Sequence, residues 1–159
     1  MPNANNIRRI LYPGSFDPFT RGHLSLVQRA LTFTDEVYIA IGINAEKKPY
    51  FDAQTRRDML ESLFADEPRV HIITYDGLTV EACTQINTRL ILRGVRNTTD
   101  LEQEWAMATM NKELANVETI FLPTDKEWAH VSSSFIRDLL RHGSDASPYL
   151  PKEIIKHLL

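Results

Sequence analysis

Cysteine is almost absent from this chain of 159 residues, since Cys83 is the only one. A single thiol cannot form a disulfide within the chain, and it excludes the cysteine clusters that hold structural metals. Cys83 lies in an apolar segment with helical spacing. We therefore interpret it as a small packing residue.

An excess of positive charge is also absent. The 18 Lys and Arg residues are outnumbered by 21 Asp and Glu residues, which gives a formal net charge of −3. This balance does not indicate a nucleic-acid-binding surface, so any anion site must be a local group of Arg and Lys side chains.

Long apolar runs are missing as well. No run approaches the roughly 20 residues that a membrane-spanning helix needs. The first six residues (MPNANN) lack the apolar core of a secretory leader. We expect a cytoplasmic protein that binds neither membrane nor nucleic acid.

The chain does contain a regular alternation of apolar runs and segments with helical periodicity. The apolar runs predict strands at residues 9–12, 37–43, 70–74, 90–92 and 117–122. The periodic segments predict helices at residues 22–31, 53–64, 79–87, 100–115, 133–141 and 151–158. We predict a single domain over residues 1–159, built on an open α/β sheet of five parallel strands with helices on both faces.

The first predicted strand is followed by several phosphate-binding residue types. Ligands of such sheets bind beyond the carboxyl ends of the strands. Gly14 and Ser15 come there, and a helix then begins near Thr20 with His23 in its first turn. Glycine allows close backbone approach, hydroxyl and imidazole groups donate hydrogen bonds, and a helix N-terminus attracts phosphate. Each residue alone fits an ordinary turn or surface position, but the four together indicate a phosphate site.

Basic residues follow two further strands. Lys47 can place an ammonium group over the site, although a solvated loop explains it equally well. Arg93 ends the fourth strand, where a charge is costly unless an anion or an internal carboxylate pairs with it. Arg96 follows Gly94 closely, so two guanidinium groups can converge on phosphate oxygens. Glu104, in the first turns of the next helix, can reach a ribose hydroxyl.

Three consecutive serines, Ser132, Ser133 and Ser134, open the helix after the fifth strand. Serine commonly caps a helix, but three in a row with Arg137 in the first turns exceed what capping needs. We interpret them as a second helix N-terminus offered to phosphate, with pure capping as the alternative. Neither a Walker loop nor a Gly-x-Gly-x-x-Gly motif accompanies these residues, and no acid–base carboxylate pair does. The sequence therefore predicts a pocket that stabilises phosphoryl charge.

Taken together, these motifs resemble those of the phosphopantetheine adenylyltransferases, bacterial enzymes of the nucleotidyltransferase superfamily. The resemblance runs essentially from end to end, through YPGSFDP at 12–18, TRGH at 20–23, KKP at 47–49, RGVR at 93–96, MN at 110–111, KEW at 126–128 and VSSSFIR at 131–137. It implies a Rossmann-like fold and transfer of the adenylyl group of ATP to 4′-phosphopantetheine with Mg²⁺. The products would be dephospho-coenzyme A and pyrophosphate, in coenzyme A biosynthesis.

The resemblance also implies roles for individual residues. The acceptor 4′-phosphopantetheine would be bound by Ser15, Lys47, Thr79 and Arg93. ATP would be bound by Ser15, Phe16, His23, Gly94, Arg96, Glu104, Trp128, Ala129, His130, Val131, Ser132, Ser133 and Ser134. The catalytic residues would be His23, Ser15, Lys47 and Arg93, without a covalent intermediate. No protein ligand of Mg²⁺ is identified.

Three positions depart from the family pattern. Thr79 stands where an apolar residue is common, Gln103 replaces a frequent tyrosine, and His130 replaces a frequent aromatic residue. These changes concern affinity or regulation rather than the class of reaction.

The predicted helix 100–115 carries apolar residues on more than one side, which indicates deep burial or a subunit interface. The family forms hexamers, so the resemblance implies a homohexamer. It also implies coenzyme A as a feedback inhibitor.

Two other functions stay open from the sequence. A related nucleotidyltransferase could use nicotinamide mononucleotide or glycerol phosphate as acceptor, but this would not explain Lys47 together with Arg93 and Arg96. A protein that senses ATP without turnover would be expected to lack His23, Lys47 or Arg93, and all three are present.

Overall fold

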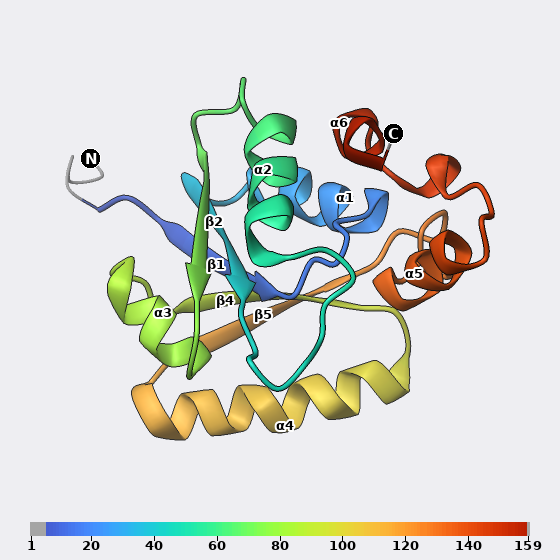
Figure 1. The fold of residues 1–159 in the computed structure, drawn as a ribbon. Helices are drawn as coiled ribbons and strands as arrows, with labels where there is room; N and C mark the ends of the chain where they lie inside the picture. The colour runs from blue at the N-terminus through green and yellow to red at the C-terminus, as the bar shows by residue number, and fades with distance from the viewer. Residues whose placement is uncertain (1–5, 159) are drawn as a thin grey trace.

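A five-stranded parallel sheet forms the centre of the protein, as the computed structural model of residues 6–158 shows (Figure 1). The strands are β1 (Arg9–Gly14), β2 (Glu36–Gly42), β3 (Val70–Tyr75), β4 (Leu90–Val95) and β5 (Glu118–Pro123). Their order across the sheet is β3-β2-β1-β4-β5. The predicted Rossmann-like α/β fold is confirmed. The statement that the first six residues lack the apolar core of a secretory leader concerns mainly residues 1–5, which lie outside the described range.

The helices follow the predicted pattern closely. They are α1 (Arg21–Ala30), α2 (Ala53–Leu63), α3 (Thr79–Gln85), α4 (Thr98–Ala115), α5 (Ser133–Arg141) and α6 (Lys152–Ile155), with short 3-10 turns at Ser147–Tyr149 and Lys156–Leu158. The last predicted helix, 151–158, divides into α6 and the second 3-10 turn. Among residues 6–158, no helix is both long and apolar enough to cross a membrane.

Strands β1 and β4 run further than their apolar runs predict. The pairing of β1 with β2 continues through Pro13 and Gly14, and that of β4 with β5 continues through Arg93, Gly94 and Val95. Neighbouring strands therefore extend these segments beyond their own β propensity. As a result, Gly14, Arg93 and Gly94 lie in the last residues of strands rather than in loops.

The sheet has an apolar core on each face. Ile10 and Tyr12 of β1 pack on one face with residues of α1, α2, α5 and α6, whereas Leu11 packs on the other with Cys83 of α3. This alternation is expected for strands covered on both sides. Figure 1 shows α4 on the opposite side of the sheet from α1, α2 and α6. Cys83 is 1% exposed, and burial raises the pKa of its thiol to about 11, as expected for a packing residue.

The chain reverses its direction across the sheet between β1 and β4. From β1 it moves outward through β2 to β3, then returns to place β4 beside β1 before adding β5. In open α/β sheets a ligand binds at this reversal, outside the carboxyl ends of the strands.

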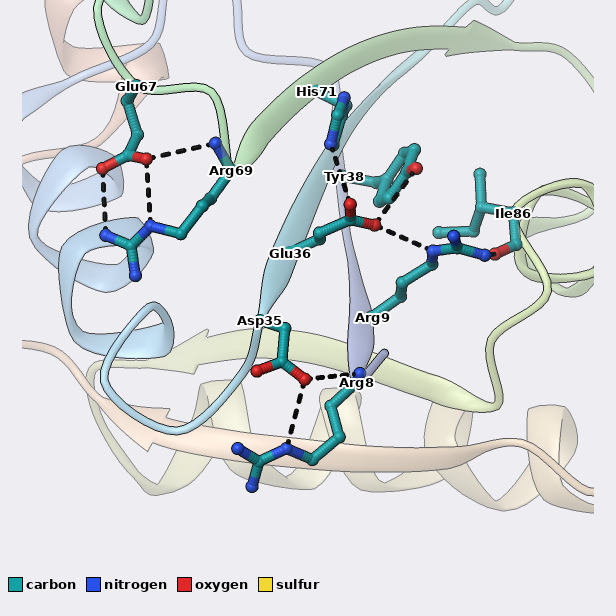
Figure 2. Close-up of polar contacts among 9 residues, drawn as sticks. All are labelled: Arg8, Arg9, Asp35, Glu36, Tyr38, Glu67, Arg69, His71 and Ile86. Carbon is teal, nitrogen blue, oxygen red and sulfur yellow. Dashed lines mark hydrogen bonds and ion pairs between the residues drawn. The ribbon is translucent and has the colours of Figure 1, made fainter. Parts of the chain in front are cut away.

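Polar contacts tie together the opposite, amino-terminal ends of β1, β2 and β3 (Figure 2). Glu36 accepts a hydrogen bond from Arg9 Nε at 2.8 Å and lies 3.6 Å from His71 Nε2. The ring of His71 stacks on Tyr38 with 4.5 Å between centroids. These contacts cross from strand to strand. They therefore fix the alignment of the three strands at their amino-terminal ends, opposite the carboxyl edge of the sheet.

Candidate active site

A cavity of about 380 Å³ lies at the carboxyl edge of the sheet, where β1 and β4 are neighbours. Its volume suits a small-molecule site. The walls come from β1, the start of α1, β4, the start of α4 and the start of α5. The lining residues are Tyr12, Pro13, Gly14, Ser15, Phe16, Thr20, Gly22, His23, Leu26, Arg93, Gly94, Arg96, Asp100, Gln103, Glu104, Thr124, Val131, Ser132 and Ser133.

The loop after β1 turns sharply at Phe16. This residue has a φ of 47°, a left-handed conformation that is costly for an aromatic residue. The ring of Phe16 folds back over Gly14, where an added Cβ would lie 3.0 Å from the ring. The glycine is therefore needed for this close packing. The turn leaves Ser15 exposed in the cavity wall.

His23 is fixed by a capping box at the start of α1. The backbone N–H of Thr20 donates to His23 Nδ1 at 3.0 Å, and the backbone N–H of His23 donates to Thr20 Oγ1 at 3.4 Å. Because Nδ1 accepts a hydrogen bond, the proton of the neutral ring lies on Nε2. His23 is thus held as a hydrogen-bond donor through Nε2.

The surroundings of His23 keep its ring neutral. The rings of Phe16 and Phe19 both lie 5.2 Å from the imidazole, between centroids. Burial, with a smaller contribution from the charges of Arg93 and Arg96, lowers the pKa of His23 to about 3. The ring can therefore donate from Nε2 at neutral pH without carrying a charge.

Arg93 is held by an internal carboxylate, one of the alternatives that the sequence left open. Its Nε and NH2 groups both donate to Glu104 at 2.7 Å, and its NH1 group donates to the carbonyl oxygen of Pro13 at 2.6 Å. A guanidinium has five N–H donors, so two remain after these three bonds. Glu104 therefore orients Arg93 and leaves donors free for an anion.

The Arg93–Glu104 pair also separates two cavities. Both residues line the larger cavity and a smaller one of about 120 Å³. Thr79, Tyr75 and Met107 contribute to the smaller cavity, whose other lining residues are Pro13, Gly14, Ile91, Ala108, Asn111 and Thr119. Together with Pro13 and Gly14, this ion pair thus forms a common wall of the larger and the smaller cavity.

Arg96, in the loop after β4, has a carboxylate partner on α4, the helix that also carries Glu104. Its Nε donates to Asp100 at 3.0 Å, and its backbone N–H donates to the same carboxylate at 3.2 Å. Asp100 and Glu104 are one turn apart on α4. The two arginines among the lining residues are therefore matched by two carboxylates, and with His23 neutral the lining side chains carry no net charge.

The serines at the start of α5 have structural partners. Ser132 is the N-cap, and its Oγ accepts the backbone N–H of Phe135 at 3.1 Å. The hydroxyl of Ser133 donates to the carbonyl oxygen of Pro18 at 2.8 Å. Capping is thus part of their role, as the alternative interpretation holds. Both residues also line the larger cavity.

The structure brings most of the candidate residues to the two cavities. Ser15, Phe16, His23, Gly94, Arg96, Val131, Ser132 and Ser133 line the larger one, Thr79 lines the smaller, and Arg93 and Glu104 line both. The candidates outside the described walls of both cavities are Lys47, Trp128, Ala129, His130 and Ser134. Lys47 lies in the exposed segment between β2 and α2.

Asp100 was missed as a site residue. The signal was present, because it follows Arg96 by four residues at the start of the predicted helix 100–115, but the sequence does not show that its carboxylate turns back to Arg96. Among the described residues, no group of three or more His, Cys, Asp or Glu side chains could hold a metal ion.

Known proteins resemble the chain over nearly its whole length. A sequence model of the family described as cytidylyltransferase-like matches residues 11–139. The phosphopantetheine adenylyltransferase of Phocaeicola vulgatus is 48% identical over 146 residues, which is 92% of this chain and 97% of the relative. The protein of the same name from Bacteroides thetaiotaomicron is 44% identical with the same coverage. That from Leptospira biflexa is 43% identical over 89% of each chain.

A solved structure shares the fold at low sequence identity. The bifunctional NMN adenylyltransferase/ADP ribose pyrophosphatase from Francisella tularensis superimposes with a TM-score of 0.68 and 18% identity. The match covers 91% of this chain and 45% of that one. At this identity the likeness concerns the fold only.

Proposed function

Because the chain belongs to the phosphopantetheine adenylyltransferase family, we propose that it transfers the adenylyl group of ATP to 4′-phosphopantetheine. The products are dephospho-coenzyme A and pyrophosphate, so the reaction is a step of coenzyme A biosynthesis. The enzyme is a nucleotidyltransferase, the class to which an adenylyltransferase belongs.

The observation that carries this proposal is the pair of cavities with a common wall at Arg93 and Glu104. A reaction that joins two phosphates needs both substrates to meet at one point. ATP would occupy the larger cavity, whose walls include the starts of α1, α4 and α5. The acceptor's phosphate would bind at the common wall near Arg93, and its arm would enter the smaller cavity past Thr79.

In the proposed reaction, an oxygen of the acceptor phosphate attacks the α-phosphorus of ATP in line. The bond from that phosphorus to the oxygen bridging the β-phosphate breaks, and pyrophosphate leaves with the electron pair. The attacking oxygen is already ionised at neutral pH, so no general base is needed. Catalysis then rests on positioning and on donors placed where charge develops.

His23 is the proposed donor to the α-phosphate. Its neutral ring carries the proton on Nε2, so it can hydrogen-bond to an oxygen whose negative charge grows in the transition state. Ser15, Arg93 and Lys47 are the proposed partners of the acceptor phosphate. For Lys47 to take part, the exposed segment between β2 and α2 would have to bring its ammonium group to the cavity.

The remaining site residues are proposed to bind ATP. Gly94, Arg96, Glu104 and the start of α5 lie in the cavity wall. Trp128 packs beside it, since an added Cβ on Gly22 would lie 3.4 Å from Trp128 Cβ. We place the adenine near the segment from Trp128 to Ser134.

Mg²⁺ is the proposed cofactor. The described residues offer no cage of carboxylates or imidazoles, which suits an ion that keeps several waters and binds mainly through substrate phosphates. When bound, it would neutralise charge on the leaving pyrophosphate. Chelation with EDTA should abolish pyrophosphate release, and added Mg²⁺ should restore it.

Three further properties belong to the same proposal. The protein would act in the cytoplasm, where ATP is available. Coenzyme A, which contains the product's pantetheine arm, would compete for the same cavities as a feedback inhibitor. The protein would assemble as a homohexamer, which the exposed apolar residues of α4 support, because Trp105 and Met107 are both more than 60% exposed in one chain.

The test is a pyrophosphate-release assay with ATP and a set of phosphorylated acceptors. We expect release with 4′-phosphopantetheine and none with nicotinamide mononucleotide or glycerol phosphate. Release with either of the latter alone would favour the related nucleotidyltransferase. Binding of ATP without release from any acceptor would favour a nucleotide sensor.

A further inference from the structure

Arg56 is a buried cation whose partners are all backbone carbonyls. The residue is 4% exposed, in the second turn of α2. Its NH1 group donates to the carbonyl oxygen of Ser15 at 2.7 Å and of Gly42 at 3.4 Å, and its Nε donates to that of Asp52 at 3.4 Å. Among residues 6–158, no carboxylate oxygen lies within 4.0 Å of its side-chain nitrogens.

A buried charge without a counter-ion is destabilising. Arg93, which lines both cavities, has its carboxylate in Glu104. The shared hydrogen bond to Ser15 connects Arg56 directly to the loop that lines the larger cavity. The carboxylate of Asp52 acts on Arg56 only from beyond 4.0 Å, so an anion bound at that loop would add to the negative charge around this cation.

The end of β1 and the loop after it are held at several other carbonyls. Arg93 binds the carbonyl of Pro13, Arg137 donates to that of Asp17 at 2.9 Å, and Ser133 binds that of Pro18. The donors come from β4 and α5, whereas Arg56 comes from α2. Carbonyl oxygens repel phosphate, so tying them to donors removes that repulsion and fixes the loop's shape.

The charge balance of the cavity also matters for the binding of an anion. The lining arginines are matched by Asp100 and Glu104, so they do not by themselves provide net positive charge. Behind the loop lie Arg56 and Arg137, with the buried carboxylate of Asp17 as the opposing charge. That carboxylate is bound by the backbone N–H groups of Tyr50 and Phe51, both at 2.8 Å.

We propose that Arg56 is a positioning residue for phosphate binding: it fixes the loop through the carbonyl of Ser15 and places positive charge behind it. The residue does not line either cavity and would not touch the substrate. The inference rests on the proposed function, in that the larger cavity binds the phosphates of ATP.

The test compares the dissociation constants of ATP and adenosine, measured by calorimetry, in the wild type and in Arg56→Met. We expect Arg56→Met to weaken ATP binding at least tenfold and adenosine binding less than twofold. The matched control is Arg57→Met, which removes the same charge from the next, half-buried position of α2, where Arg57 pairs with Glu61. The control should change neither constant by more than twofold.

A second variant covers a failure of Arg56→Met to fold, as judged by urea unfolding. Arg56→Lys keeps the charge but has one nitrogen to share among three carbonyls, so we expect ATP to bind at least threefold more weakly, with adenosine unchanged. Equal losses of affinity for ATP and adenosine would show a merely structural role and overturn the inference. A folded variant in which the ratio of the two dissociation constants equals that of the wild type would overturn it as well. If the wild type itself does not bind ATP, the proposed function fails and this inference with it.

Discussion

The protonation state of His23 decides what a single residue can do in this cavity. In the proposed reaction, a neutral ring that donates from Nε2 would contribute only through one hydrogen bond. Loss of one such transition-state donor typically lowers turnover by about 10²–10³-fold. We expect this loss in His23→Ala, measured as pyrophosphate release at saturating substrates. Urea unfolding should show a folded protein, and His142→Ala, at the exposed end of α5, should keep wild-type turnover.

The lowered pKa of His23 predicts a pH dependence of stability. An unfolded chain protonates this ring below about pH 6.5, whereas the folded protein does so only near pH 3. Between these two pH values only the unfolded chain binds the proton. The free energy of unfolding is therefore unaffected by this ring above about pH 6.5 and decreases as the pH falls toward 3.

Urea titrations between pH 7 and 4 should show this difference. Acidification should lower the free energy of unfolding less in His23→Gln than in the wild type. The difference between the two proteins should be at most about 1.4 kcal/mol per pH unit. Imidazole NMR should show the Nε2–H tautomer of His23 at pH 7. A ring that titrates near pH 6.5 would contradict the assignment.

Site residues were predictable from the sequence where residue type and position after a strand were enough to identify them. His23, Arg93 and Arg96 were singled out for that reason, and all three line the larger cavity. Their partners were harder to predict. The bond from Arg93 to Glu104 links β4 with α4, and the partners of Arg56 lie in three separate segments. No local pattern encodes such distances.

At the level of elements, the contact between α1 and β4 depends on Gly94. A Cβ added there would lie 2.4 Å from Leu26 Cδ1, and Leu26 is 4% exposed. We expect Gly94→Ala to lower the free energy of unfolding by about 1–3 kcal/mol through overpacking. ATP binding should weaken too, since both residues line the larger cavity.

The matched control is Gly42→Ala at the end of β2. There an added Cβ would meet its nearest atom at 3.6 Å, an ordinary contact. This variant should unfold within about 0.5 kcal/mol of the wild type. Equal stability of the two variants would contradict the packing argument.

The type and order of the elements were predictable because each has a strong period. The strand ends were less so, since β1 and β4 continue through Pro13, Gly14, Arg93 and Gly94 only because paired neighbours extend them. For helix α4, the sequence could not decide between two environments. Its apolar residues suggested burial or an interface, and the structure leaves none of its 18 residues buried in the single chain.

At the scale of the whole molecule, the exposed apolar residues of α4 predict assembly. Met110 and Leu114 are 53% and 57% exposed. Light scattering after size exclusion should give the mass of a hexamer of 18.3 kDa chains. Met110→Glu should shift the protein toward smaller species, because a charge would enter an apolar interface. Glu102→Gln, an exposed change on the same helix, should keep the wild-type mass. A wild-type monomer would contradict the proposal.

The sequence by itself determined the class of the sheet, the order of its elements and the residue types at its carboxyl edge. These follow from periodicity and from residue chemistry, which are local. Only the tertiary structure decided that His23 is neutral, that Arg93 and Arg96 are held by α4, and that Arg56 lies behind the loop of Ser15. Each depends on burial and on groups from distant segments, so each arises only when the chain has folded.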